Sequence, residues 1–149
     1  MPHRIIGDVL RFTLAYNPGA AFGMHLGPGS RWIFAVLSVV IVVVLLRATA
    51  DLTRVSRLAA FGVPVVVGGA IGNLLDRVRL REGVVDFIDI GIGSVRFWTF
   101  NVADTCVTIG AACLVIALWQ QDTAQQNMAH PESAPSPSAE AGDAGHGQS

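Results

Sequence analysis

Two aspartates, Asp86 and Asp104, are the residues of this chain whose type and setting point most directly to chemistry. Asp104 lies four residues into an otherwise apolar stretch that begins at Asn101 and continues to Leu118. A carboxylate at or just inside a bilayer costs roughly 2.5–3.5 kcal/mol on insertion scales, so it marks a functional site with a partner by default. The partner that the sequence offers is Asp86, eighteen residues upstream between Val85 and Phe87.

Two facing carboxylates favour acid–base chemistry on a single water. They cannot both ionise cheaply, so one keeps a proton and the pair titrates as a unit. The ionised member can activate a water that attacks a peptide carbonyl, while the protonated member donates to the carbonyl oxygen. The sequence therefore predicts aspartyl hydrolysis by Asp86 and Asp104. Asn101, one helical turn before Asp104, can hydrogen-bond either the pair or a substrate backbone.

Each of these polar residues also has a simpler interpretation. Asp104 could cap a helix start or interact with its dipole. Asp76 and Arg77 could form an interfacial charge pair, and Asn73 could make a hydrogen bond between helices. A small proton-coupled transport subunit also uses intramembrane acids, but it predicts carboxylates spread along a path through the bilayer, whereas these acids cluster at one end of the apolar runs.

The composition predicts a membrane protein. Of the 149 residues, 52% are hydrophobic and 14% are charged, against about 25% charged residues in ordinary soluble domains. All ten basic residues are Arg, and none of them cluster as in a nucleic-acid-binding patch. We therefore expect no nucleic acid partner.

Three apolar runs predict three transmembrane helices, at about residues 31–47, 58–75 and 99–119, joined by a link at 47–57 that lies in water. Strand-like stretches at 9–16 and 95–100 predict a small surface sheet. The expected fold class is an all-α membrane protein with a small β element, in a membrane-embedded domain of residues 1–120. The polar segment 121–149 should be disordered.

The apolar runs also predict where functional residues gather. Gly68 and Gly72 form a GxxxG pair, which lets another helix approach closely. Because successive spans alternate in direction, the start of the first, the end of the second and the start of the third share one face of the membrane. That face carries the segments that begin at Asn17, at Gly68, at Val85 and at Asn101.

Taken together and in this order, four segments resemble the lipoprotein signal peptidase (signal peptidase II) family over roughly residues 8 to 118. The segments are residues 16–23 (YNPGAAFG), 68–77 (GGAIGNLLDR), 84–88 (VVDFI) and 100–105 (FNVADT). By motif match, the resemblance implies Asp86 and Asp104 as the catalytic pair. It implies a substrate-binding or site-shaping role for Asn17, Gly69, Asn73, Asp76, Arg77 and Asn101.

The resemblance also implies an activity and a location. The enzyme would be an intramembrane aspartyl endopeptidase of the bacterial cytoplasmic membrane that removes the signal peptide from prolipoproteins, just before a Cys bearing a diacylglyceryl group. It would contact membrane lipid, use no metal or organic cofactor, and bind globomycin-type inhibitors. Its active site and a β-rich extracytoplasmic cradle would lie near the outer face.

The chain departs from the family in one respect. The family usually has four spans, and the first carries an Asp and a Lys near its outer end, whereas this sequence starts just before the Asn17 segment and contains no Lys. The start could be mis-assigned or the chain truncated. An alternative function is therefore a catalytically inactive paralogue that binds lipoprotein precursors or a membrane partner.

Charge counting also opposes the expected orientation. Seven arginines fall on the side of the site (Arg4, Arg11, Arg31, Arg77, Arg79, Arg81 and Arg96), against Arg47, Arg54 and Arg57 on the other. The positive-inside rule would turn the site towards the cytoplasm. The resemblance implies the outer face, and we expect that orientation.

Overall fold

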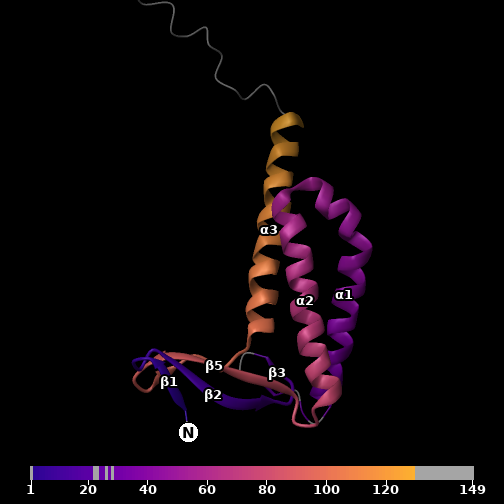
Figure 1. The fold of residues 1–149 in the computed structure, drawn as a ribbon. Helices are drawn as coiled ribbons and strands as arrows, with labels where there is room; N and C mark the ends of the chain where they lie inside the picture. Colours follow the sequence, from indigo (N-terminus) through magenta and orange to yellow (C-terminus); the bar gives the residue numbers. More distant parts are fainter. Residues whose placement is uncertain (1, 22–23, 26, 28, 130–149) are drawn as a thin grey trace, which may run out of the picture.

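Three long helices form a bundle that stands on a small sheet (Figure 1). The structure is a computed structural model, and it describes residues 2–21, 24–25, 27 and 29–129. The helices are α1 (Ser30–Val55), α2 (Arg57–Arg79) and α3 (Val102–Ala129), of 26, 23 and 28 residues. At about 1.5 Å per residue each exceeds the ~30 Å of a bilayer core. All three are apolar enough to cross a membrane, as the sequence predicted.

The helix ends differ from the predicted spans in two places. The link at 47–57 is helical up to Val55, and only Ser56 separates α1 from α2. The segment contains no Gly or Pro to end α1 earlier, and the Ser56 side chain caps α2 by accepting from the Ala59 N–H at 3.1 Å. The two helices therefore meet in a one-residue turn.

The prediction that the polar tail is disordered from residue 121 is also wrong for its first nine residues. Helix α3 continues to Ala129, because residues 120–129 are mostly Gln and Ala, which sustain a helix without an apolar face. Residues 130–149 lie outside the described part of the chain.

The sheet lies across the end of the bundle, to one side of the helices (Figure 1). Its order is β1 (His3–Ile6), β2 (Leu10–Asn17), β5 (Val84–Ile92) and β6 (Val95–Arg96), with antiparallel neighbours. A separate hairpin pairs β3 (Ala20–Ala21) with β4 (Met24–His25). The sequence predicted β2 and the β6 region but missed β5, whose acids at 86 and 89 interrupt its apolar pattern.

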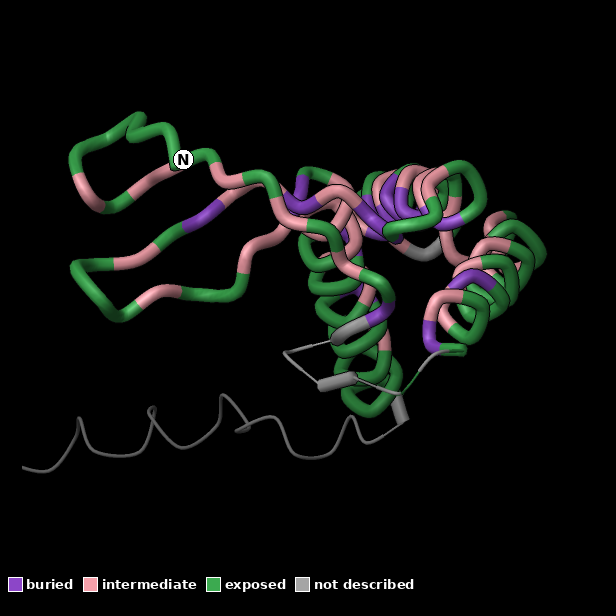
Figure 2. The backbone as a smooth tube through the Cα atoms, turned by 90° about the horizontal axis from the view of Figure 1, so that it is seen from below, coloured by how far each residue is buried: buried purple, intermediate pink, exposed green. Residues whose placement is uncertain are grey.

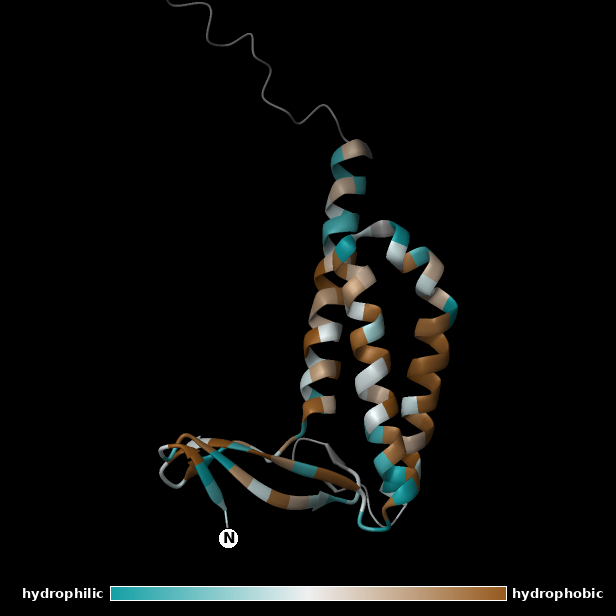
Figure 3. Ribbon diagram, in the orientation of Figure 1, coloured by the Kyte–Doolittle hydropathy of each residue, from teal (hydrophilic) through white to brown (hydrophobic). Residues whose placement is uncertain are grey.

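Helix α2 is the centre of the bundle. Of its most apolar window 39% is buried, against 6% for α1 and 11% for α3. Helix α1 is mostly hydrophobic (Figure 3), and many of its large apolar residues, such as Trp32, Val36 and Val44, are exposed. Most residues of the three helices are exposed or partly exposed (Figure 2). Such a surface requires lipid around it.

Glycines set the close approach of α2 and α3, but not the predicted pair. A Cβ on Gly68 would meet nothing within 4 Å, whereas a Cβ on Gly69 would lie 2.5 Å from the Ala103 carbonyl oxygen. Gly62 and Gly110 face each other in the same way. The GxxxG prediction was therefore wrong at Gly68, because spacing alone does not tell which helix face meets the neighbour.

Candidate active site

A cluster of buried polar side chains lies where α2, α3 and the sheet meet. Asp86 is 3% exposed on β5, Asn101 is 5% exposed just before α3, and Asn73 and Arg77 are each 8% exposed on α2. Asp104 is half-buried in the first turn of α3. Segments far apart in the sequence thus bring both predicted acids into one cluster.

Asn101 links the two aspartates directly. Its Nδ2 donates to Asp86 Oδ1 at 2.8 Å, and its backbone N–H donates to Asp104 Oδ2 at 3.2 Å. Its Oδ1 accepts the backbone N–H of Asp104 at 3.0 Å. The reciprocal bonds between residues 101 and 104 form the arrangement of a capping box. The capping interpretation of Asp104 is therefore correct, and it coexists with the contact that both acids make with Asn101.

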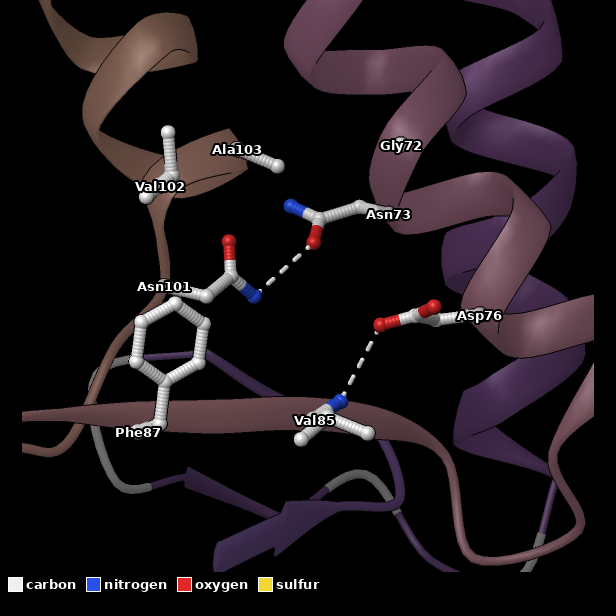
Figure 4. A pocket seen from close by; sticks show the side chains of 8 residues that line it. All are labelled: Gly72, Asn73, Asp76, Val85, Phe87, Asn101, Val102 and Ala103. Atoms are coloured by element: carbon white, nitrogen blue, oxygen red, sulfur yellow. Dashed lines mark hydrogen bonds between the residues drawn. The ribbon is translucent and has the colours of Figure 1, made fainter. Parts of the chain in front are cut away.

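Asn73 completes the network from α2. Its Nδ2 donates to Asp104 Oδ1 at 2.7 Å, and its Oδ1 accepts from Asn101 Nδ2 at 3.1 Å (Figure 4). Both oxygens of Asp104 therefore accept an N–H, one from Asn73 and one from Asn101. Asn73 makes the predicted hydrogen bond between helices, and its amide bonds to both Asp104 and Asn101.

Burial raises the pKa of Asp86 above its ordinary value, and the nearby charge of Asp104 raises it further. Hydrogen bonds from the side chains of Asn17 and Asn101 and the charge of Arg77 oppose this shift. Asn17 is oriented for its bond, since its Oδ1 accepts the Gly19 N–H at 3.0 Å and leaves the Nδ2 for Asp86. The environment thus favours a proton on Asp86.

Arg77 supplies positive charge beside the aspartates. Its Nη1 donates to the Asn73 carbonyl at 3.0 Å, and its guanidinium lies 5.5 Å from the centre of the Phe34 ring. Arg31, at the start of α1, donates to the carbonyls of Arg77, Val78 and Arg81 at the end of α2. A cation at a helix C-terminus is favourable, so Arg31 fixes the end of α2 that carries the site.

In the described part of the chain, the ion pairs do not include the charge pair predicted between Asp76 and Arg77. Its Oδ2 instead accepts the backbone N–H of Val85 on β5 at 3.2 Å (Figure 4). Beside this contact lies a cavity of about 290 Å³. Its walls are Gly72, Asn73, Asp76, Val85, Phe87, Asn101, Val102 and Ala103.

The structure brings together seven of the eight predicted site residues: Asn17, Asn73, Asp76, Arg77, Asp86, Asn101 and Asp104. Gly69 takes part only through the packing of α2 against Ala103. Asp89, only three residues after Asp86, is bound instead by Arg96, with 2.9 Å between Arg96 Nε and Asp89 Oδ1. Sequence reasoning missed Phe87 and the clamp by Arg31. In the sequence Arg31 only marks the start of the first apolar run, which gave no sign of its partners.

Comparison with known proteins matches the helices and the sheet as a whole. The sequence profile of the family described as Signal peptidase (SPase) II matches residues 1–120. A lipoprotein signal peptidase of Halothermothrix orenii is 44% identical over 119 residues, which are 79% of this chain and 76% of that protein. One from Geobacillus kaustophilus is 42% identical over 115 residues, or 77% and 73% of the two chains.

Two solved structures have a similar fold. A bacterial membrane enzyme determined by the in meso method at 2.3 Å has a TM-score of 0.69 and 28% identity, and the match covers 91% of this chain and 77% of that one. A second, determined at 1.9 Å, has a TM-score of 0.61 and 31% identity, and covers 79% and 74%.

Proposed function

The chain belongs to the signal peptidase II family, and we propose that it is an aspartic endopeptidase that removes signal peptides from prolipoproteins, with Asp86 and Asp104 as its catalytic pair. One observation carries the assignment of the pair. Both carboxylates, from different elements, are bonded to the same residue, Asn101. Relatives of the chain are named lipoprotein signal peptidases, which supports the substrate class.

The surroundings of the two acids favour different roles for them. Asp104 is the less buried of the two and accepts one N–H on each oxygen, so we assign it the role of the base. Asp86 is almost fully buried and its pKa is raised, so it holds the proton and acts as the acid. Asn73 and Asn101 have their amides engaged with the acids, and they position the pair rather than contact substrate.

The reaction follows from these roles. Asp104 takes a proton from a water, whose oxygen bonds to the scissile carbonyl carbon as Asp86 donates its proton to the carbonyl oxygen. The intermediate is a neutral gem-diol. It collapses when Asp104 passes its proton to the leaving nitrogen and Asp86 recovers one from a hydroxyl. Both acids return to their starting states, and the C–N bond is broken.

The natural substrate in this proposal carries a diacylglyceryl group on the Cys after the scissile bond, and globomycin-type inhibitors compete with it. The exposed apolar helices support such a substrate, because a lipid-anchored peptide would reach the site along the membrane. The site lies at the outer face of the bacterial cytoplasmic membrane.

The charges at the two ends are compatible with that orientation. Four of the seven arginines on the site side are partly or fully buried, namely Arg11, Arg31, Arg77 and Arg96. The exposed ones are Arg4, Arg79 and Arg81, against exposed Arg47, Arg54 and Arg57 at the other end. The two ends therefore carry equal numbers of exposed arginines, and the excess of charge that opposed an outward-facing site is not found among exposed residues.

An inactive, binding-only protein is not favoured. A cluster used only for binding would not need to bury one carboxyl group beside a second one, since burial of such a group costs stability. The pair is also complete, with each member held by amide donors.

Prolipoprotein processing in cells that lack their own enzyme tests the proposal. We expect the wild-type chain to restore processing, globomycin to block it, and Asp86→Asn or Asp104→Asn to reduce it by at least about 10⁴-fold, as loss of either member of an acid–base pair does. Asp51→Asn, at the exposed far end of α1, is the matched control. Normal processing by either site variant would overturn the assignment.

A further inference from the structure

Building on the proposed peptidase function, we propose that the peptide around the scissile bond binds as an added strand along the edge of β5 next to Asp86. In the free enzyme, the Asp76 carboxylate accepts the hydrogen bond of the Val85 backbone N–H on that edge.

Strand β5 has one edge that is only partly covered. Its other edge pairs with β2 from Leu10 to Asn17. On the open side, the Phe97 N–H donates to the Ile90 carbonyl at 2.7 Å, and the Phe100 N–H donates to the Ile88 carbonyl at 3.0 Å. The covering chain stops there, because Asn101 starts the turn into α3.

A bulge marks the end of this cover. The backbone N–H groups of Phe87 and Ile88 both donate to the Phe100 carbonyl, at 3.0 and 2.7 Å. Two residues opposite one is the pattern of a β-bulge, which is common next to active sites and re-aims the strand. Beyond the bulge, Asp86 pairs in register with Ala15 of β2.

The next backbone donor beyond the bulge is bonded to a side chain instead of a strand. The Val85 N–H donates to Asp76 Oδ2 at 3.2 Å. Asp76 comes from α2 and is only half-buried. A carboxylate on a side chain can rotate away from an edge that it caps, so this donor is available to an incoming carbonyl group.

The space beside this edge suits an extended chain. The cavity of about 290 Å³ runs along Val85 and Phe87, and its opposite wall is α2 at Gly72 and α3 at Ala103. Neighbouring strands lie about 4.8 Å apart. A peptide paired with Val85 therefore passes directly over the segment that carries Asp86. Strand addition of this kind takes its affinity from backbone hydrogen bonds.

Backbone methylation of the substrate tests the pairing. The probe is a synthetic peptide with a diacylglyceryl-modified Cys just after the scissile bond, N-methylated at one position at a time except at the scissile amide. We expect the Kd for the Asp86→Asn variant to rise about tenfold at the one residue whose N–H pairs with β5 at Val85, the cost of a lost hydrogen bond, and by less than about twofold at the residues on either side. Equal effects at every position, or none, would contradict strand addition.

The cap is tested by Asp76→Asn in the otherwise wild-type enzyme. An Asn keeps an acceptor near the Val85 N–H but loses the charge, and charge-assisted hydrogen bonds are roughly twice as strong as neutral ones. Substrate should therefore displace it more easily, and KM should fall about threefold. A rise in KM would mean that Asp76 itself holds the substrate, and would overturn its role as a cap.

The two proposals can fail separately. Cleavage of the unmodified peptide by wild type, with none by Asp86→Asn, supports the peptidase whatever the methylation pattern shows. If methylation weakens binding only at the residue paired with Val85 but the peptide is never cleaved, the proposed function fails and the strand-binding edge stands. An unmodified peptide that does not bind contradicts both.

Discussion

At the scale of single residues, the chemistry of the site depends on how differently two similar acids are surrounded. Asp86 and Asp89 lie on the same strand, yet Asp89 is neutralised by Arg96 whereas Asp86 is buried among amides. Type and spacing in the sequence predict Asp86 and Asp104, and the structure brings both to the same residue, Asn101. The sequence could not reveal that the amides of Asn73 and Asn101 donate to the two acids, because that depends on three elements meeting.

Burial of Asp86 should reduce the stability of the fold at neutral pH. A carboxyl whose pKa is raised in the folded state binds more protons folded than unfolded, so stability falls as pH rises from about the ordinary value through the raised one. Asp86→Asn removes this penalty. We expect its Tm in detergent to exceed that of wild type by a few degrees at pH 7, with a difference that shrinks towards pH 4.

The matched control for that measurement is Asp89→Asn. It breaks the contact with Arg96 and should lower the Tm at pH 7, because the loss of a charged hydrogen bond costs about 1.5–3 kcal/mol. If Asp86→Asn were destabilised in the same way at pH 7, the proton assigned to Asp86 would be wrong.

At the scale of elements, close packing of α2 against α3 holds the two halves of the site together. Apolar periodicity was enough to predict three spans and part of the sheet. The helix ends at Val55 and Ala129 were not predicted, because polar residues can continue a helix. Strand β5 was not predicted, because its two acids break the apolar pattern. Which face of α2 contacts α3 depends on how α2 is rotated about its own axis, and the spacing of glycines does not determine that rotation.

Gly69→Ala should disturb both stability and activity. Its Cβ would approach the Ala103 carbonyl oxygen at 2.5 Å, so the backbones must separate next to Asp104, at a cost of about 1–3 kcal/mol. We expect a lower Tm and a lower kcat for cleavage of the lipopeptide.

Gly68→Ala, one residue away, provides the comparison. Its Cβ meets nothing within 4 Å, and Ala favours a helix over Gly by about 1 kcal/mol. Its Tm should be unchanged or higher and its kcat unchanged. Equal damage by both substitutions would show that α2 and α3 do not meet at Gly69.

In the whole molecule, a sheet at one end of the bundle and three alternating helices place the start of α3, where the aspartate cluster lies, and the far end of α3 on opposite sides (Figure 1). The order of the spans was enough to predict that the functional segments converge. The placement of the sheet beside the bundle required the contacts of β5 with α2 and with the chain before α3, which no local pattern encodes.

Labelling with a membrane-impermeant maleimide in intact cells tests the orientation. Ser94→Cys, in the exposed turn between β5 and β6, should be labelled from outside, whereas Asp51→Cys, at the far end of α1, should react only after permeabilisation. The parent chain, with Cys106 and Cys113 half-buried in α3, gives the background. The reverse pattern would place the site in the cytoplasm.

The most direct test of the central claim is the rate of lipopeptide cleavage by Asp86→Asn, Asp104→Asn and the double variant. Groups that act as one unit are grossly non-additive. We therefore expect each single variant to lose essentially all of the activity, and the double variant to be no slower than either. A single variant that keeps a substantial rate, or a double variant slower by the product of the two losses, would show that the two aspartates do not act as a pair.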